Sequence, residues 1–198
     1  SEIEVTHPFG YTWLESDQIA CLGGPLSRVG EYMFEKCGGA ETPQYFTQSL
    51  IDTQAAKMRG NTPTMPGAVE LVRQLQSYGV KTALVSASPR NIVDAVLDNL
   101  GHDLFPFSIS SDDVENTKPH PDAYLKAASI SDADISNCLI FEDSLTGMKA
   151  ATSSGAFLIA VPQLVTIEES AMVRVIRSLE QLSFHKIAQL HGDFSSAI

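Results

Sequence analysis

The chain has 198 residues, enough for one well-filled core or for a core with a small accessory domain. Its composition, 43% hydrophobic and 19% charged, is that of a soluble globular protein, and no apolar stretch approaches the roughly 18 residues that a membrane-spanning helix needs. The formal net charge of −11 and the lack of a Lys/Arg cluster argue against nucleic-acid binding, and they require any phosphate site to be locally positive or to hold a metal ion.

Three cysteines are widely spaced and form no C-x-x-C motif: Cys21, Cys37 and Cys138. This pattern predicts reduced thiols rather than a disulfide framework or a structural zinc site. The first residues show no secretory signal pattern, so we expect a cytoplasmic protein that contacts no membrane. We expect a monomer or a weak oligomer.

Residues 1–63 are predicted to form a small α-helical domain. No convincing strand pattern occurs there, and large apolar residues recur at helical spacing, namely Tyr32, Phe34, Tyr45, Phe46, Leu50, Ile51 and Met58. Glycine-containing segments at residues 21–25 and 37–39 predict breaks between the helices. We place the domain boundary here, with a second domain over residues 64–198.

In the second domain short β-prone runs alternate with helical patterns. Helices are predicted at residues 68–78, 89–100, 121–128 and 144–154, and strands at residues 81–85, 107–110, 138–141 and 156–161. Residues 168–190 are predicted to form one or two further helices, and the last eight residues to be frayed. This alternation predicts a Rossmann-like parallel sheet flanked by helices, with ligands at the carboxyl ends of the strands.

The first polar cluster, Ser86-Ala87-Ser88, follows the apolar run that ends at Val85 and precedes a predicted helix. A hydroxyl group and free backbone N–H groups at the start of a helix can bind an anion. Ser88 as a plain helix cap is the simpler interpretation of this segment by itself.

The second cluster is Lys118-Pro119-His120-Pro121-Asp122. The two prolines restrict the backbone and start a helix, so the position of Lys118 is well defined. A lysine ammonium group is a compact charge suited to phosphate oxygens. A solvated surface lysine before a helix is the alternative.

The third cluster is the acidic pair Glu142-Asp143, which directly follows the apolar run 138–141. Adjacent carboxylates repel one another unless a cation compensates them, and Mg²⁺ prefers such oxygen ligands. Acids that stabilise the start of the next helix, with Ser144 as its cap, are the alternative. Because the three clusters follow strands of one predicted sheet, we expect them to converge at one edge and to supply what phosphoryl transfer requires.

These motifs resemble those of the haloacid dehalogenase superfamily, and in particular its β-phosphoglucomutase-like and phosphatase group. The resemblance covers about residues 10–180 and implies that Ser86 and Ala87 bind the phosphoryl group and that Lys118 neutralises its charge. It further implies that Asp143, assisted by Glu142, holds Mg²⁺. The helical domain corresponds to the family's cap, where Arg28 is the best match for a substrate-binding arginine, with a solvated arginine as the alternative.

One family motif is absent. An Asp-x-Asp after an early strand supplies the aspartyl nucleophile and the general acid/base in the family, whereas the only Asp-x-Asp here is Asp132-Ala133-Asp134, in a polar loop. We therefore expect that the first strand and nucleophile are missing upstream and that the chain as written is inactive.

The leading hypothesis is thus a Mg²⁺-dependent phosphatase or phosphomutase of small sugar or organic phosphates. The alternative is a non-catalytic pseudo-enzyme that binds phosphate and metal. A dehalogenase would leave the acidic pair unexplained, and a serine hydrolase would need a Gly-x-Ser-x-Gly motif, which does not occur.

Overall fold

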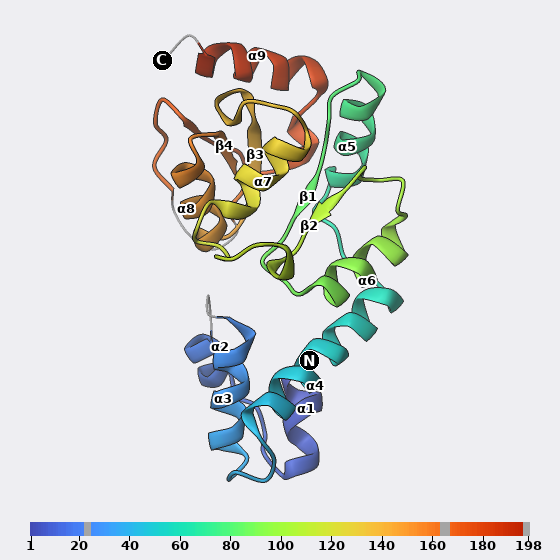
Figure 1. Cartoon of the computed structure of the whole chain (residues 1–198), viewed down its shortest axis with the longest axis vertical. Helices are drawn as coiled ribbons and strands as arrows, with labels where there is room; N and C mark the ends of the chain where they lie inside the picture. The colour runs from blue at the N-terminus through green and yellow to red at the C-terminus, as the bar shows by residue number, and fades with distance from the viewer. Residues whose placement is uncertain (22–24, 163–166, 196–198) are drawn as a thin grey trace. The chain divides into compact units, whose positions relative to one another are not determined.

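The computed structural model describes residues 1–21, 25–162 and 167–195 (Figure 1). The chain divides into two compact units by its internal contacts. The helical unit consists of Ser1–Thr62 together with Asn91–Leu100, and the α/β unit of Pro63–Arg90 together with Gly101–Ile198. None of the described helices is both long enough and apolar enough to cross a membrane.

Among the residues that the structure describes, the helical unit contains four helices before residue 62 and most of a fifth. These are α1 (Glu2–Thr6), α2 (Glu15–Cys21), α3 (Leu26–Lys36), α4 (Pro43–Gly60) and α6 (Arg90–Leu100), with a 3₁₀ turn at His7–Phe9. Thr42 caps α4 by accepting the Tyr45 N–H at 3.1 Å. Large apolar side chains fill the core of this unit, namely Val5, Trp13, Val29, Met33, Cys37, Phe46 and Leu50.

Helices α3 and α4 pack closely because Gly30 has no side chain. A Cβ atom there would lie 2.0 Å from Thr47 Oγ1 and 2.7 Å from Pro43 O, which no side chain can tolerate. The outer face of α4 is covered in turn by α6, since Ala55 packs with Ile92 and Ala95. Residues 91–100 therefore belong to the helical core although they follow the predicted boundary at residue 63.

The described part of the α/β unit holds two parallel sheets. One pairs β1 (Leu84–Val85) with β2 (Ser108–Ile109), and the other has the order β3 (Leu139–Glu142), β4 (Phe157–Ala160), β5 (Val173–Val175). The helices are α5 (Ala68–Ser77), α7 (Asp122–Ile130), α8 (Leu145–Ser154) and α9 (Phe184–Ser195). Short 3₁₀ turns lie at Ser111–Asp113, Ile135–Asn137 and Leu179–Gln181.

Helices cover both faces of the three-stranded sheet. Leu158 and Ala160 face a core formed with α7 and α8, while Ile159 and Val161 face a core formed with α5 and α9. Alternate side chains of β4 thus point into opposite layers, and all four of its residues are buried. The predicted fold class, a parallel sheet flanked by helices beside a small helical unit, is confirmed.

The prediction for residues 168–190 was wrong in part. It proposed only helices, but Val173–Val175 forms β5 and pairs in parallel with β4, and α9 starts only at Phe184. The β-branched residues of this segment fit a strand, and the open edge of β4 supplies the hydrogen-bond partners. Of the other predicted strands, β1, β2 and β4 are shorter than expected, whereas β3 has the predicted length and starts one residue later.

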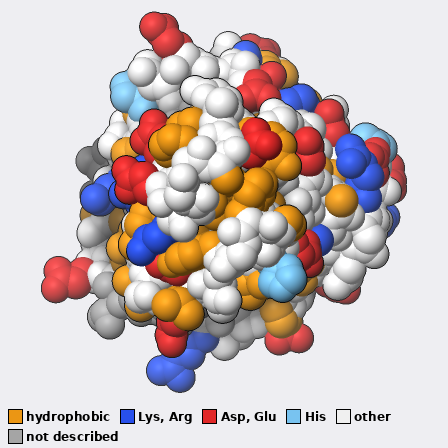
Figure 2. Space-filling view, turned by 90° about the horizontal axis from the view of Figure 1, so that it is seen from below, with side chains coloured by type: hydrophobic (Ala, Val, Ile, Leu, Met, Phe, Trp, Pro, Cys, Tyr) orange, Lys and Arg blue, Asp and Glu red, His pale blue; other side chains and the backbone are white. Residues whose placement is uncertain are grey.

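The surface agrees with the charge pattern of the sequence. On the described part of the face in Figure 2, hydrophobic side chains gather near the middle with acidic side chains around them. Lys and Arg side chains are scattered over this face and form no basic patch.

Candidate active site

Lys118 joins the ends of two strands. Its Nζ atom donates to the Val85 carbonyl at 2.9 Å and to Glu142 Oε1 at 2.6 Å. Val85 is the last residue of β1 and precedes Ser86, and Glu142 is the last residue of β3. The structure therefore brings all three polar clusters of the sequence together at the carboxyl ends of the strands.

The Lys118–Glu142 ion pair is almost completely buried, since only 7% and 9% of the two side chains are exposed. A buried pair is retained only when further hydrogen bonds offset its desolvation. The Tyr124 hydroxyl supplies one by donating to Glu142 Oε1, and Lys118 Nζ lies 4.6 Å from the centre of the Tyr124 ring. Burial, reinforced by the negative charge of Glu142, raises the pKa of Tyr124 far above its ordinary value, so this phenol remains a donor.

The second oxygen of the Glu142 carboxylate is also engaged. Ser144 Oγ donates to Oε2 at 3.1 Å and itself accepts the Gly147 N–H at 3.0 Å, which caps α8. A Cβ atom on Gly147 would lie 2.0 Å from the Glu142 carboxyl carbon. Only glycine at position 147 therefore allows the carboxylate to lie over the first turn of α8.

Asp143 differs from its neighbour because it is exposed. Asp143 and Glu142 offer the hard oxygen atoms that suit Mg²⁺, and no group of three or more His, Cys, Asp or Glu side chains able to hold a metal ion occurs among the described residues. Mg²⁺ commonly keeps several waters and uses only one or two protein carboxylates together with substrate phosphate. Asp143 is the accessible carboxylate for such an ion, since both oxygen atoms of Glu142 already accept hydrogen bonds.

The Ser86 segment forms a tight turn between β1 and α6. Its backbone N–H donates to the Ile109 carbonyl at 2.8 Å, which extends the β1–β2 ladder, and its Oγ accepts the Ser88 N–H at 3.1 Å. Ala87 lies at the bend and is exposed. The Ser88 backbone thus supports the Ser86 side chain.

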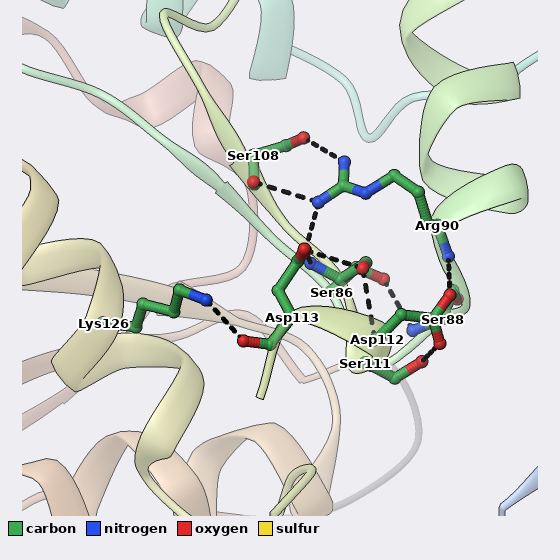
Figure 3. A network of polar contacts seen from close by, with 9 residues as sticks. Ser86, Ser88, Arg90, Ser108, Ser111, Asp112, Asp113 and Lys126 are labelled. Carbon is green, nitrogen blue, oxygen red and sulfur yellow. Dashed lines mark hydrogen bonds and ion pairs between the residues drawn. The ribbon is translucent and has the colours of Figure 1, made fainter. Parts of the chain in front are cut away.

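The sequence reasoning did not identify two groups that the structure adds. Tyr124 reaches Glu142 from α7, and Arg90 pairs with Asp113 beyond the end of β2 (Figure 3). The sequence around Tyr124 does not indicate a role in the site, because Tyr124 contacts Glu142 only in the folded chain. The spacing Ser110-x-x-Asp113 was visible as a helix-capping pattern, and the structure contains this capping box.

Arg28 belongs to the helical unit and lies in the first turn of α3. Its Nη2 donates to the Ala20 carbonyl at 3.2 Å. The contact with substrate that the resemblance implies stays a prediction.

The sole Asp-x-Asp lies away from the other groups. Asp134 caps a 3₁₀ turn by accepting the N–H and the hydroxyl of Ser136, at 2.9 and 2.8 Å. This turn leads into the amino end of β3, whereas Glu142 ends that strand. A strand rises about 3.3 Å per residue, so the length of β3 separates Asp134 from the candidate site.

Comparisons with known proteins agree with this geometry. The model of the haloacid dehalogenase-like hydrolases matches residues 28–155. The chain belongs to this family. Protein SUPPRESSOR OF QUENCHING 1, chloroplastic, of Arabidopsis thaliana is 42% identical over 161 residues, which cover 80% of this chain but only 15% of the relative. Hexitol phosphatase B of Escherichia coli is 34% identical over 165 residues, which cover 75% of this chain and 74% of the relative.

This chain also shares its fold with a solved structure. The β-phosphoglucomutase of Clostridium difficile superposes with a TM-score of 0.71 at 24% identity, covering 98% of this chain and 89% of that chain. The family that the motifs predicted is confirmed by the family model and by the phosphatase relative, and the solved structure shows the same fold.

Proposed function

We propose that the α/β unit is the phosphoryl-transfer part of a phosphatase or phosphomutase that acts on small sugar or organic phosphates. The observation that carries this proposal is the fixed position of the Lys118 ammonium group, between the ends of β1 and β3 and next to Ser86. The similarity to a hexitol phosphatase supports a small phosphorylated metabolite as the substrate.

The charges of the site support a requirement for Mg²⁺. Lys118 contributes one positive charge, and Glu142 and Asp143 contribute two negative charges, so the three side chains together repel a phosphate anion. A divalent cation beside Asp143 reverses the sign of this local charge. When bound, Mg²⁺ would stabilise the charge that develops on the phosphoryl oxygens.

Ser86 and Lys118 are proposed to bind the phosphoryl group directly. A lysine ammonium group has three N–H donors, and Val85 and Glu142 use two of them, which leaves one for a phosphoryl oxygen. Since Ser86 Oγ already accepts the Ser88 N–H, its own hydrogen can be donated to the same group. The backbone N–H of Ala87, which lies in the bend between Ser86 and Ser88, is a third candidate donor.

The helical unit is proposed to act as the family's cap, with Arg28 in contact with the distal part of the substrate. The predicted cap, residues 1–63, is then joined by residues 91–100, and the rest of the predicted core, residues 64–198, forms the other unit. An Arg28→Gln variant tests this role, because it should weaken binding of a sugar phosphate and leave the binding of inorganic phosphate unchanged.

A second candidate function has one observation in its favour. The sole Asp-x-Asp of the chain caps a turn before β3, so it cannot supply a nucleophile next to Lys118. For the chain as written we therefore propose binding of phosphate and metal with little or no turnover. A carboxylate nucleophile beside Lys118 would have to come from residues other than Asp132 and Asp134.

Binding of inorganic phosphate, followed by ³¹P NMR with Mg²⁺ present, tests the proposed site. We expect Lys118→Met to weaken binding by at least about tenfold, because a charge-assisted hydrogen bond is lost. Lys81→Met is the matched control, since Lys81 lies ahead of β1 and donates to the Ser131 carbonyl. Ser86→Ala serves as a second variant if Lys118→Met fails to fold, and equal binding in all variants would refute the site.

Hydrolysis of p-nitrophenyl phosphate tests the nucleophile. We expect the 198-residue chain to show little or no turnover even when Mg²⁺ and phosphate bind. Robust Mg²⁺-dependent turnover would show that a nucleophile is present among these residues and would overturn the non-catalytic interpretation.

A further inference from the structure

Two loops at the carboxyl ends of β1 and β2 are tied together (Figure 3). The first loop starts at Ser86 and leads into α6, and the second follows β2 through the 3₁₀ turn Ser111–Asp113. The Ser111 N–H donates to the Ser88 carbonyl at 3.0 Å, and the Arg90 N–H donates to Asp112 Oδ2 at 2.9 Å. The second loop thus holds the backbone of the first at two points.

An ion pair between Arg90 and Asp113 completes the connection. Asp113 Oδ2 accepts the N–H and the hydroxyl of Ser110, both at 2.7 Å, and also pairs with the Arg90 guanidinium. Arg90 Nη1 donates to Ser108 Oγ at 2.7 Å and Nη2 to the Ser108 carbonyl at 3.2 Å. A planar guanidinium group can serve several acceptors in fixed directions, so this contact defines geometry as well as charge.

The protonation state of Asp113 is consistent with a permanent contact. Burial opposes ionisation of this carboxyl, but the hydrogen bonds from Ser110 and the Arg90 guanidinium outweigh it and lower the pKa to about 2. The lysine of α7 adds a further link, since Lys126 Nζ donates to the Asp113 carbonyl.

The orientation of the Ser86 hydroxyl depends on these contacts. A free serine hydroxyl group samples three staggered side-chain rotamers. Here Ser86 Oγ accepts the Ser88 N–H, and that N–H keeps its place because Ser111 and Arg90 fix the backbone on either side of Pro89. A group fixed before the substrate arrives loses less entropy on binding than a mobile one.

We propose that Arg90 and Asp113 are positioning residues that hold the Ser86–Ser88 turn in the geometry in which the Ser86 hydroxyl is directed at a phosphoryl group. The inference rests on the proposed function for its ligand. Neither residue is proposed to touch the substrate. They act through Ser111, Asp112 and the first turn of α6.

Amide hydrogen exchange of the whole chain, measured by NMR, tests the connection. In Asp113→Asn we expect the Ser88 and Ser111 amides to exchange at least about tenfold faster, while the amide of the buried Leu158 in β4 keeps its rate. Arg90→Lys keeps the charge but not the forked geometry, so we expect a smaller acceleration of exchange at the same two amides. Asp103→Asn is the matched control, because its ion pair with Arg73 is at 3.6 Å and exposed.

Inorganic phosphate binding in the same variants tests the consequence. We expect a severalfold weaker affinity in Asp113→Asn and none of this loss in Asp103→Asn. Unchanged exchange at Ser88 and Ser111, equal acceleration of all amides, or faster exchange with unaltered phosphate affinity would each overturn the inference. Failure of the unaltered chain to bind phosphate would overturn the proposed function and this inference together.

Discussion

Each unit contains one buried carboxylate surrounded by tyrosine and lysine side chains. In the helical unit, Asp17 is 2% exposed and accepts hydrogen bonds from Tyr11 and Tyr32, both at 2.8 Å, with Lys36 at 3.6 Å. In the α/β unit, Glu142 accepts from Tyr124 and from Lys118. The two sites use the same chemical groups in different surroundings.

The difference lies in what surrounds each carboxylate. The Leu14 N–H donates to Asp17 at 2.8 Å at the start of α2, and this bond together with the tyrosine hydroxyls lowers the pKa of Asp17 against the opposing effect of burial. Asp17 is therefore fully enclosed by its own unit. Glu142 instead ends a strand and adjoins the exposed Asp143 and Ser144. The two carboxylates therefore differ in that only Glu142 borders exposed polar groups.

Neutralising each carboxylate in turn should show the largest difference between the two units, in stability for Asp17 and in phosphate binding for Glu142. We expect Asp17→Asn to lower the melting temperature by more than about 5 °C without changing phosphate affinity. Glu142→Gln removes one repulsive charge but also the ion pair that fixes the buried Lys118 ammonium group, and we expect the lost position to dominate and to weaken phosphate binding by about tenfold. Calorimetry and ³¹P NMR on both variants measure the two effects. Loss of phosphate binding in Asp17→Asn would contradict the distinction.

A substitution next to Glu142 should have a smaller effect. Gly147→Ala places a methyl group where the Glu142 carboxylate lies, so we expect a loss of about 2 kcal/mol in the free energy of unfolding, with weaker phosphate binding. Gly192→Ala, in α9, is the control because a Cβ atom there meets nothing within 4 Å. Urea unfolding measures both, and equal stabilities would show that Glu142 can move without cost.

The smallest expected effect concerns acid stability. The folded pKa values of Asp17 and Asp113 lie below the ordinary value of 3.8, and that of Asp113 is about 2. Both groups therefore contribute stability that is complete above pH 3.8 and is lost as the pH falls through their folded values. We expect Asp113→Asn to show a shallower decline in melting temperature from pH 4 to pH 2 than the unaltered chain. Parallel declines would contradict this assignment.

Local patterns in the sequence were sufficient for most of the fold. The apolar runs before Ser86 and Glu142 predicted strands, and Ser144 and Gly155 marked the ends of a helix, as the structure shows. These signals are local because caps and apolar runs act over a few residues. The segment around Val173 was misread because its strand depends on pairing with β4.

The arrangement within the site could be predicted only in part. The expectation that Ser86, Lys118 and Glu142 meet followed from the rule that strand ends share one edge of a sheet. The contact of Tyr124 with Glu142 joins residues 18 positions apart, and that of Arg90 with Asp113 joins residues 23 apart. Such contacts leave no periodic trace in the sequence, so only the folded chain reveals them.

The return of α6 to the helical unit affects the order in which the chain can fold during synthesis. Ala55 is buried against Ile92 and Ala95, so a nascent chain that ends near residue 62 still exposes one apolar side of α4. Domains generally fold as units while the ribosome extends the chain. The helical unit is thus incomplete when its first 62 residues have been made, and its core closes only after the strand and loop that lead to Ser86 have also been made.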